Sequence, residues 1–389
     1  MKYIIWAFRI IIGLLFIFSG LIKANDPLGL TYKMNEFFEV WNMNYMVKYT
    51  LFLSVCMIAF EIITGVAMLV GNYFRLYITL LLLLNIFFTF LTGYALYSGK
   101  IKECGCFGDC IKLSNSVTFY KDVVLSSIAI FLFIFRYRVF PVFQQAAINA
   151  SIVGAAVIFA FGLQWYTLTH LPINLPGAPL SLFHDCLPYK PGNNIWEKMQ
   201  PGKDAVAPVY KTTFVYAKNG LEKTFDETNY PWQDTTWKIV ANKTKHELVS
   251  EGSGQPEIHD FSLTDSNNTD QTEAILTAKG YTFLWFLRDP ETSKNVNMDR
   301  LHNLSAKAAA MHIPFYAACS GDREICRTYQ EVWSMKDVPF MIIDGTVSKT
   351  ALRTNPGLML LKDGVVVKKW SYLDYPKDMT LENGTLNLK

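Results

Sequence analysis

Five apolar stretches dominate residues 1–166, and each is long enough to cross a lipid bilayer. A membrane-spanning α-helix needs about 20 mainly apolar residues. The stretches that meet this length are 3–23, 49–70, 74–98, 117–135 and 144–166. The chain after residue 185 instead carries most of the charged side chains. This pattern predicts a multi-domain protein with an α-helical transmembrane bundle over 1–168 and a water-exposed part after it.

Basic residues between the stretches predict how the bundle is oriented. Lysine and arginine are enriched in cytoplasmic loops, and one side of the predicted bundle holds Lys2, Arg75, Arg136 and Arg138. Lys102 and Lys112 on the other side weaken this bias without reversing it. We therefore expect a bacterial inner-membrane protein with a cytoplasmic N-terminus and a periplasmic C-terminal half. No small-residue cleavage site precedes Lys23, so we interpret the first stretch as a retained anchor.

The water-exposed half divides into three parts by pattern. Residues 169–210 are punctuated by proline, which predicts a stiff linker. Residues 211–255 alternate apolar and polar positions around the turn Asn219-Gly220, which predicts a small β region. In 256–389, short apolar strands alternate with helical segments, the order typical of an α/β domain.

Charge and histidine content argue against two classes of partner. The formal net charge is only +3 over 389 residues, and lysine and arginine form no dense run, so we expect no nucleic-acid partner. The six histidines are scattered, and the cysteines lack the four-ligand spacing of a zinc site. We expect no metal site, and the lipid bilayer is the partner that composition predicts.

Cysteine is concentrated in the connection between the third and fourth stretches. Cys104, Cys106 and Cys110 lie within seven residues, separated by two glycines that let the loop fold tightly. Cys186 follows the fifth stretch on the same side, and we favour it as the partner of the cluster. A disulfide is permitted in the periplasm. Structural bridges and a redox-active dithiol both remain open, and spacing does not assign the connectivity.

Arg9 and Glu61 are the conspicuous ionisable residues within the apolar stretches. An ionisable group inside a span is costly and usually faces a partner or a cavity. Two interpretations stay open for Glu61. In the first, Glu61 accepts a proton near the thiols or near a quinone. In the second, it pairs with Arg9 in the adjacent span.

Several motifs in the first 140 residues occur together in one known family. They are Arg9, Gly13, Phe16, Ser19-Gly20 and Lys23 in the first span, Glu61, Gly65 and Gly71 in the second, Cys104-Gly-Cys-Phe-Gly108, and Phe119-Tyr-Lys-Asp122. With these motifs, residues 1–140 resemble the DoxX and MauE group of four-helix membrane proteins. MauE-like members are associated with disulfide formation during maturation of a periplasmic enzyme. The resemblance implies thiol/disulfide redox through the Cys104-Gly-Cys-Phe-Gly108 loop, with a quinone as a candidate cofactor. Cys110, which is extra to the family pattern, and Cys186 are further candidates for the same chemistry because of their position.

A second resemblance covers about residues 256–375. The α/β order, with Asn355-Pro356-Gly357 before a strand, resembles a thioredoxin-like domain of the TlpA or peroxiredoxin type. The resemblance implies a cis peptide bond before Pro356. The catalytic CxxC of that family should follow the strand at 281–286, where this chain has no cysteine. We therefore expect a degenerate domain that docks partners, because disulfide exchange needs a thiol nucleophile.

Cys319 and Cys326 are the thiols of this domain. Three interpretations stay open for them: a structural disulfide, buried free thiols or a relocated redox pair.

For the whole chain two functions stay open, so the sequence leaves undecided whether it is an enzyme. One is a membrane thiol/disulfide or quinone-linked oxidoreductase, and the other is a non-catalytic scaffold or assembly subunit of an envelope protein complex.

Overall fold

The structure is a computed structural model, and it describes most of the 389 residues. The described residues are 1–98, 101, 108, 110–111, 113–175, 177, 182–207, 209–240, 243–250 and 252–389. The chain divides into two compact units. The larger unit combines Met1–Asn193 with Ser262–Lys389, and the smaller is Asn194–Phe261.

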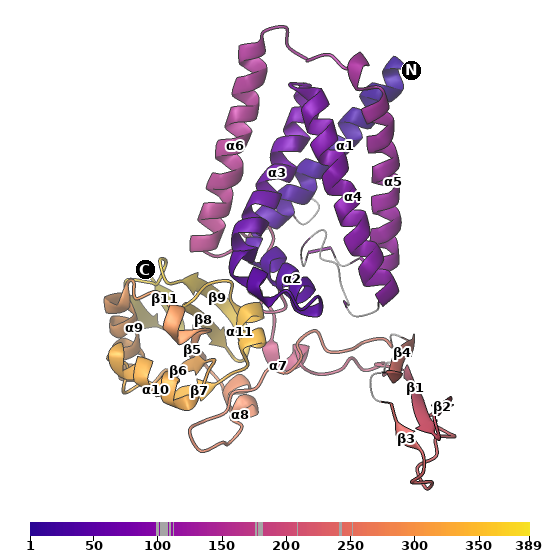
Figure 1. Ribbon diagram of the computed structural model, residues 1–389. Helices are drawn as coiled ribbons and strands as arrows, with labels where there is room; N and C mark the ends of the chain where they lie inside the picture. Colours follow the sequence, from indigo (N-terminus) through magenta and orange to yellow (C-terminus); the bar gives the residue numbers. More distant parts are fainter. Residues whose placement is uncertain are drawn as a thin grey trace. The chain divides into compact units, whose positions relative to one another are not determined.

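Five helices of the larger unit are long and apolar enough to cross a membrane, as predicted (Figure 1). They are α1 (Lys2–Asn25), α3 (Thr50–Val70) with the 3-10 turn η1 (Asn44–Tyr49) before it, α4 (Phe74–Ser98), α5 (Asn115–Ile134) and α6 (Ala146–Thr169). A short 3-10 turn, η2 (Arg136–Arg138), follows α5. The lipid bilayer is therefore the environment of this part of the chain.

The connection between the first two spans contains a helix that the apolar pattern does not predict, α2 (Pro27–Val40). It begins at Asp26, whose side chain accepts a hydrogen bond from the backbone N–H of Gly29 at 3.1 Å. Pro27 occupies the first helical position, where its missing N–H costs nothing. This cap and proline are the sequence signals of the helix.

Glycines let α1 and α3 pack with their backbones close together. A Cβ atom added at Gly65 would lie 2.8 Å from the carbonyl oxygen of Gly13, closer than real Cβ atoms approach. Small residues at such crossings are typical of membrane helix pairs. The close crossing fixes the register of α1 against α3.

Arg9 caps the end of α3 rather than pairing with Glu61. Its guanidinium donates to the carbonyl oxygens of Met68 at 2.5 Å, Leu69 at 2.6 Å and Phe140 at 3.2 Å. The last carbonyls of a helix lack intrahelical donors, and a cation there also suits the helix dipole. The expected Arg9–Glu61 pair is wrong, because Glu61 lies at the level of Lys23, about 21 Å farther along α1.

The α/β region of the larger unit is built on a five-stranded sheet with the order β7-β6-β5-β8-β9 (Figure 1). Strands β5, β6 and β7 are parallel to one another, and β8 pairs antiparallel with both β5 and β9. Trp285, the largest fully buried side chain among the described residues, lies in its core. The elements are α8 (Thr272–Leu276), β5 (Tyr281–Leu287), η5 (Pro290–Thr292), α9 (Met298–Ala310), β6 (Phe315–Cys319), α10 (Arg323–Val332), β7 (Phe340–Ile342), α11 (Gly345–Ala351), β8 (Gly357–Lys362), β9 (Val365–Ser371), β10 (Met379–Glu382) and β11 (Thr385–Leu388).

The smaller unit is a β structure built around one long strand. Its elements are α7 (Ile195–Lys198), β1 (Val209–Lys218), β2 (Leu221–Asp226), β3 (Lys238–Ile239) and β4 (Lys245–Ser250). Strand β1 pairs antiparallel with the other three. Asn219 and Gly220 both have positive φ in the β1–β2 turn, the geometry that an Asn-Gly hairpin requires.

Candidate functional site

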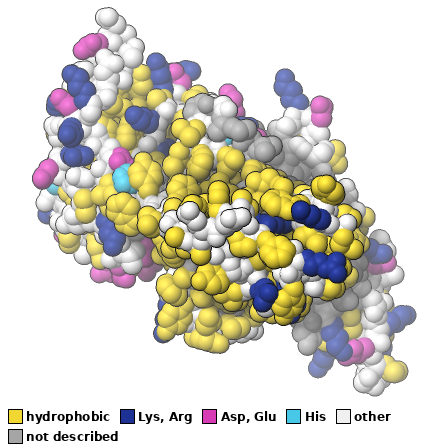
Figure 2. Space-filling view, turned by 90° about the horizontal axis from the view of Figure 1, so that it is seen from above, with side chains coloured by type: hydrophobic (Ala, Val, Ile, Leu, Met, Phe, Trp, Pro, Cys, Tyr) yellow, Lys and Arg dark blue, Asp and Glu magenta, His cyan; other side chains and the backbone are white. Residues whose placement is uncertain are grey.

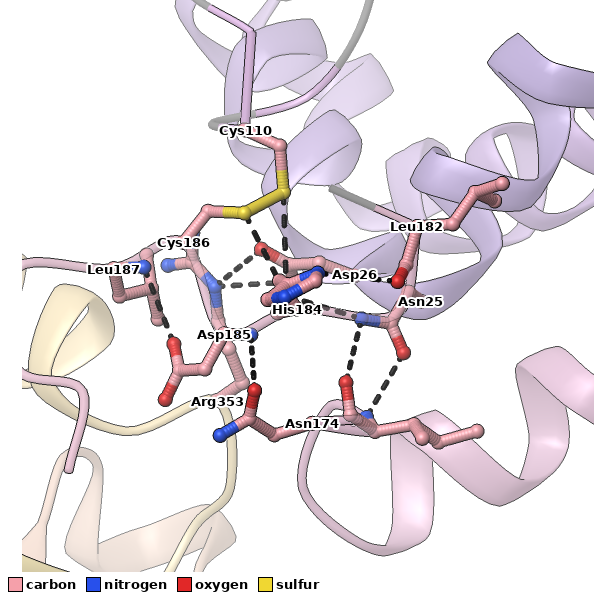
Figure 3. Close-up of a disulfide and its surroundings, with 11 residues drawn as sticks. Asn25, Asp26, Cys110, Asn174, Leu182, His184, Asp185, Cys186, Leu187 and Arg353 are labelled. Carbon is pink, nitrogen blue, oxygen red and sulfur yellow. Dashed lines mark hydrogen bonds and ion pairs between the residues drawn. A yellow bond between two sulfur atoms is a disulfide. The ribbon is translucent and has the colours of Figure 1, made fainter. Parts of the chain in front are cut away.

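A disulfide joins two distant segments at one end of the helical bundle. Cys110, in the α4–α5 connection, is bonded to Cys186, which follows α6, with Cα atoms 4.9 Å apart (Figure 3). We call this end of the bundle the disulfide end. The sequence favoured Cys186 as a partner of the cysteine cluster. Cys104 and Cys106 lie outside the described residues.

The end of α1 holds the segment that carries Cys186. The side chain of Asn25 accepts from the N–H of Ile173 at 2.9 Å and donates to the carbonyl of Ile173 at 3.1 Å and of His184 at 3.3 Å (Figure 3). Asn25 is buried. A small hollow lies beside the sulfurs, with Asn25, Asp26 and His184 in its wall. The disulfide is therefore held in a polar niche.

The same segment is fixed to the α/β region. Asp185 forms a buried ion pair with Lys369 of β9. The N–H of Gly192 donates to the carbonyl of Val366 at 2.8 Å, and the N–H of Val366 donates to the carbonyl of Asn193 at 2.9 Å. The half-cystine at 186 therefore stands between the membrane helices and the edge of the sheet.

Two arginines of the α/β region contact α2 and its cap. Nε of Arg353 lies 2.8 Å from Oδ2 and 3.0 Å from Oδ1 of Asp26. Nη1 of Arg288 donates to the hydroxyl of Tyr32 at 2.7 Å. Burial raises the pKa of Tyr32, while the two arginines act to lower it. These contacts place the loop before Pro356 against the bundle.

The peptide bond between Asn355 and Pro356 is cis. The Asn355 side chain donates to the carbonyl of Asp289 at 2.8 Å and accepts from the Ser293 hydroxyl at 2.8 Å. It organises the loop after β5. Polar contacts therefore join this loop to the one before Pro356.

A buried ion pair crosses from α1 to α3 within the membrane-spanning part. Nζ of Lys23 lies 2.6 Å from Oε1 of Glu61, and the two side chains are 3% and 2% exposed. The Ser19 hydroxyl donates to Oε2 of Glu61 at 3.0 Å. Lys23 and Ser19 belong to the motif of the first span, but sequence reasoning assigned them no role. The sequence signal for a shared role is that both residues lie on α1, in the turns nearest its disulfide end.

The comparison with known families concerns this helical part. Residues 1–135 match the family model of methylamine utilisation protein MauE. The MauE match includes Arg9, Lys23, Glu61 and Cys110, but it covers 135 of 389 residues and ends before α6. Residues 210–251 match a domain of unknown function, DUF8463. No curated protein and no solved structure matches the chain.

The remaining described cysteines lie away from the Cys110–Cys186 disulfide. Cys319, at the end of β6, is bonded to Cys326 of α10, with Cα atoms 6.0 Å apart. Both are buried in the core of the α/β region. Cys56 of α3 is a free thiol. Among the described residues, no group of three or more histidine, cysteine, aspartate or glutamate side chains could hold a metal ion.

Proposed function

We propose that the protein is a membrane-bound thiol/disulfide oxidoreductase that oxidises thiols of envelope proteins. The observation that carries the proposal is the Cys110–Cys186 disulfide, which stands in a polar hollow at the end of a MauE-matching helical bundle. We propose the same redox role for Cys104 and Cys106, on the sequence motif alone.

The reaction needs only the disulfide and a dithiol client. A client thiolate attacks one sulfur of the Cys110–Cys186 bond, which forms a mixed disulfide and releases the other sulfur as a thiolate. The second client thiolate then attacks the mixed disulfide. The client leaves oxidised, and the two cysteines keep two electrons as a dithiol. A membrane-soluble electron acceptor must restore the disulfide, and we propose a quinone for this role.

The basic side chains of the bundle support an orientation with the disulfide end in the periplasm of a bacterial inner membrane. Figure 2 looks onto the opposite end, where lysine and arginine side chains stand among hydrophobic ones. Arg75 and Arg136 both lie over the ring of Tyr137 at this end. Basic residues favour the cytoplasmic side. A periplasmic disulfide end is also compatible with stable disulfides.

We propose that the α/β region is a thioredoxin-like domain without its own thiol chemistry. The sheet order, the cis bond before Pro356 and its position beside the loop after β5 support this fold. Its only cysteines, Cys319 and Cys326, are bonded to each other in the core. We propose that the domain positions clients or partner proteins over the membrane disulfide.

A non-catalytic scaffold is the second candidate function. The observation that favours it is the ion pair between Asp185 and Lys369, which makes the Cys186 segment a brace between bundle and sheet. In this case Cys110–Cys186 stiffens an assembly subunit of an envelope complex and never turns over.

Thiol trapping separates the two functions. Full-length protein in native membranes is mixed with a reduced peptide that carries two cysteines, and each protein cysteine is scored as free or bonded over time. Turnover predicts that Cys110 and Cys186 become transiently free and that Cys110→Ser abolishes peptide oxidation. A matched control, Cys56→Ser, leaves the rate unchanged. Cysteines that stay bonded while the peptide remains reduced would support the scaffold.

A further inference from the structure

A cavity lies among α1, α3, α4 and α5, with the Lys23–Glu61 pair in its wall. It combines apolar walls, such as Leu15 and Phe88, with a polar set of side chains. The polar set is Ser19, Lys23, Glu61, Asn85, Lys121 and Asp122. A mainly apolar lining with a few polar groups is typical of small-molecule sites.

Asp122 lines this cavity and has one unsatisfied carboxylate oxygen. Its side chain is 4% exposed, and its Oδ1 atom lies 3.0 Å from Nζ of Lys121. Its Oδ2 atom is buried and has no hydrogen-bond partner among the described residues. A buried carboxylate oxygen without a donor is costly and rare. A bound ligand that donates a hydrogen bond would satisfy it.

The same cavity supplies a cation. Nζ of Lys23 contacts Glu61 and lies 5.2 Å from the ring centroid of Phe88. An ammonium carries three N–H donors, so Lys23 can bond a ligand oxygen as well as Glu61. The ligand therefore needs an oxygen acceptor for Lys23 and an O–H donor for Asp122. It also needs an apolar ring or chain for the walls.

A lipid-soluble quinol meets all of these requirements, and its quinone meets those of Lys23 and the apolar walls. The quinone carbonyls accept hydrogen bonds from a lysine, and a quinol hydroxyl donates to a carboxylate. A phospholipid head group fits poorly, because its phosphate would stand beside the carboxylates of Glu61 and Asp122.

The cavity and the disulfide hollow lie on consecutive turns of α1. Lys23 lines the cavity, whereas Ile22 and Asn25 line the hollow beside the sulfurs. Neighbouring residues of a helix rise by only about 1.5 Å each. The cavity and the hollow therefore lie at the same end of α1.

We infer that this cavity binds the ring of a lipid-soluble quinone, an inference that rests on the proposed thiol oxidation. The Cys110 and Cys186 thiols lose two protons and two electrons as their S–S bond forms. The quinone takes up two electrons and two protons and becomes a quinol, whose hydroxyl donates to Oδ2 of Asp122.

Photolabelling tests this site without measuring activity. Full-length protein in lipid nanodiscs is labelled with an azido-benzoquinone that carries a decyl chain, with and without excess decylubiquinone, and labelled peptides are mapped by mass spectrometry. We expect competed labelling on α1 and α5. Asp122→Leu removes the acceptor, and Leu15→Trp fills the cavity without touching a polar group. Each should reduce the competed labelling at least tenfold.

The exposed Glu39→Gln in α2 is the matched control and should keep full labelling. Wild-type levels in both cavity variants, or label that decylubiquinone does not compete, would overturn the inference. Leu15→Trp keeps the test informative if Asp122→Leu fails to fold. The Cys110→Ser, Cys186→Ser double variant should still be labelled, so loss of thiol turnover and loss of quinone binding are separate results.

Discussion

Lys23 of α1 and Glu61 of α3 form an ion pair of 2.6 Å with both side chains almost completely buried. Removing one partner leaves an uncompensated charge, which costs about 3–5 kcal/mol in protein interiors. We predict that Lys23→Met and Glu61→Leu each lower the thermal unfolding temperature of the purified protein. The double variant should lose less stability than the sum of the two single variants, because neither charge remains. Strictly additive losses would show that the two charges are not coupled.

Gly65 lets α3 approach the backbone of α1 at Gly13. A methyl group at this position would meet the carbonyl oxygen of Gly13 at 2.8 Å, so Gly65→Ala should force the helices apart. We expect a loss of about 1–3 kcal/mol, the usual cost of overpacking. Gly154 of α6 has no atom within 4 Å of an added Cβ among the described residues and provides the control. Gly154→Ala should be neutral or slightly stabilising, since alanine favours helix.

The same crossing explains how far the sequence alone could predict this site. Span length is a local property, so the five membrane helices could be read directly from the chain. The partner of Glu61 depends on the register of α1 against α3, and the approach of Gly13 to Gly65 sets that register. Apolar periodicity does not contain this information, which is why Arg9 was expected in place of Lys23. Which cysteine of the cluster bonds to Cys186, here Cys110, likewise depends on how the α4–α5 connection folds.

The ion pair between Arg353 and Asp26 couples the α/β region to the bundle. The Arg353 side chain is 4% exposed and that of Asp26 is 20% exposed, so solvent screens the pair only in part. We predict that Arg353→Met increases amide hydrogen exchange in the first turn of α2, because Asp26 also caps that helix. Lys307→Met, which breaks the exposed pair with Asp378, should leave α2 exchange unchanged. Equal exchange in both variants would mean that the contact does not order α2.

The two described disulfides should respond differently to reductant. Cys110 and Cys186 are half-buried beside a hollow, whereas Cys319 and Cys326 are 0% and 1% exposed. A reducing thiol must reach a sulfur along the S–S axis, so access controls the rate. We predict that Cys110 and Cys186 react with a maleimide after mild dithiothreitol treatment of the folded protein, several-fold faster than Cys319 and Cys326. Denaturant should abolish this difference by exposing all four sulfurs. If Cys319 and Cys326 react first under native conditions, the α/β core opens more readily than the hollow beside α1, and the redox role would move to that pair.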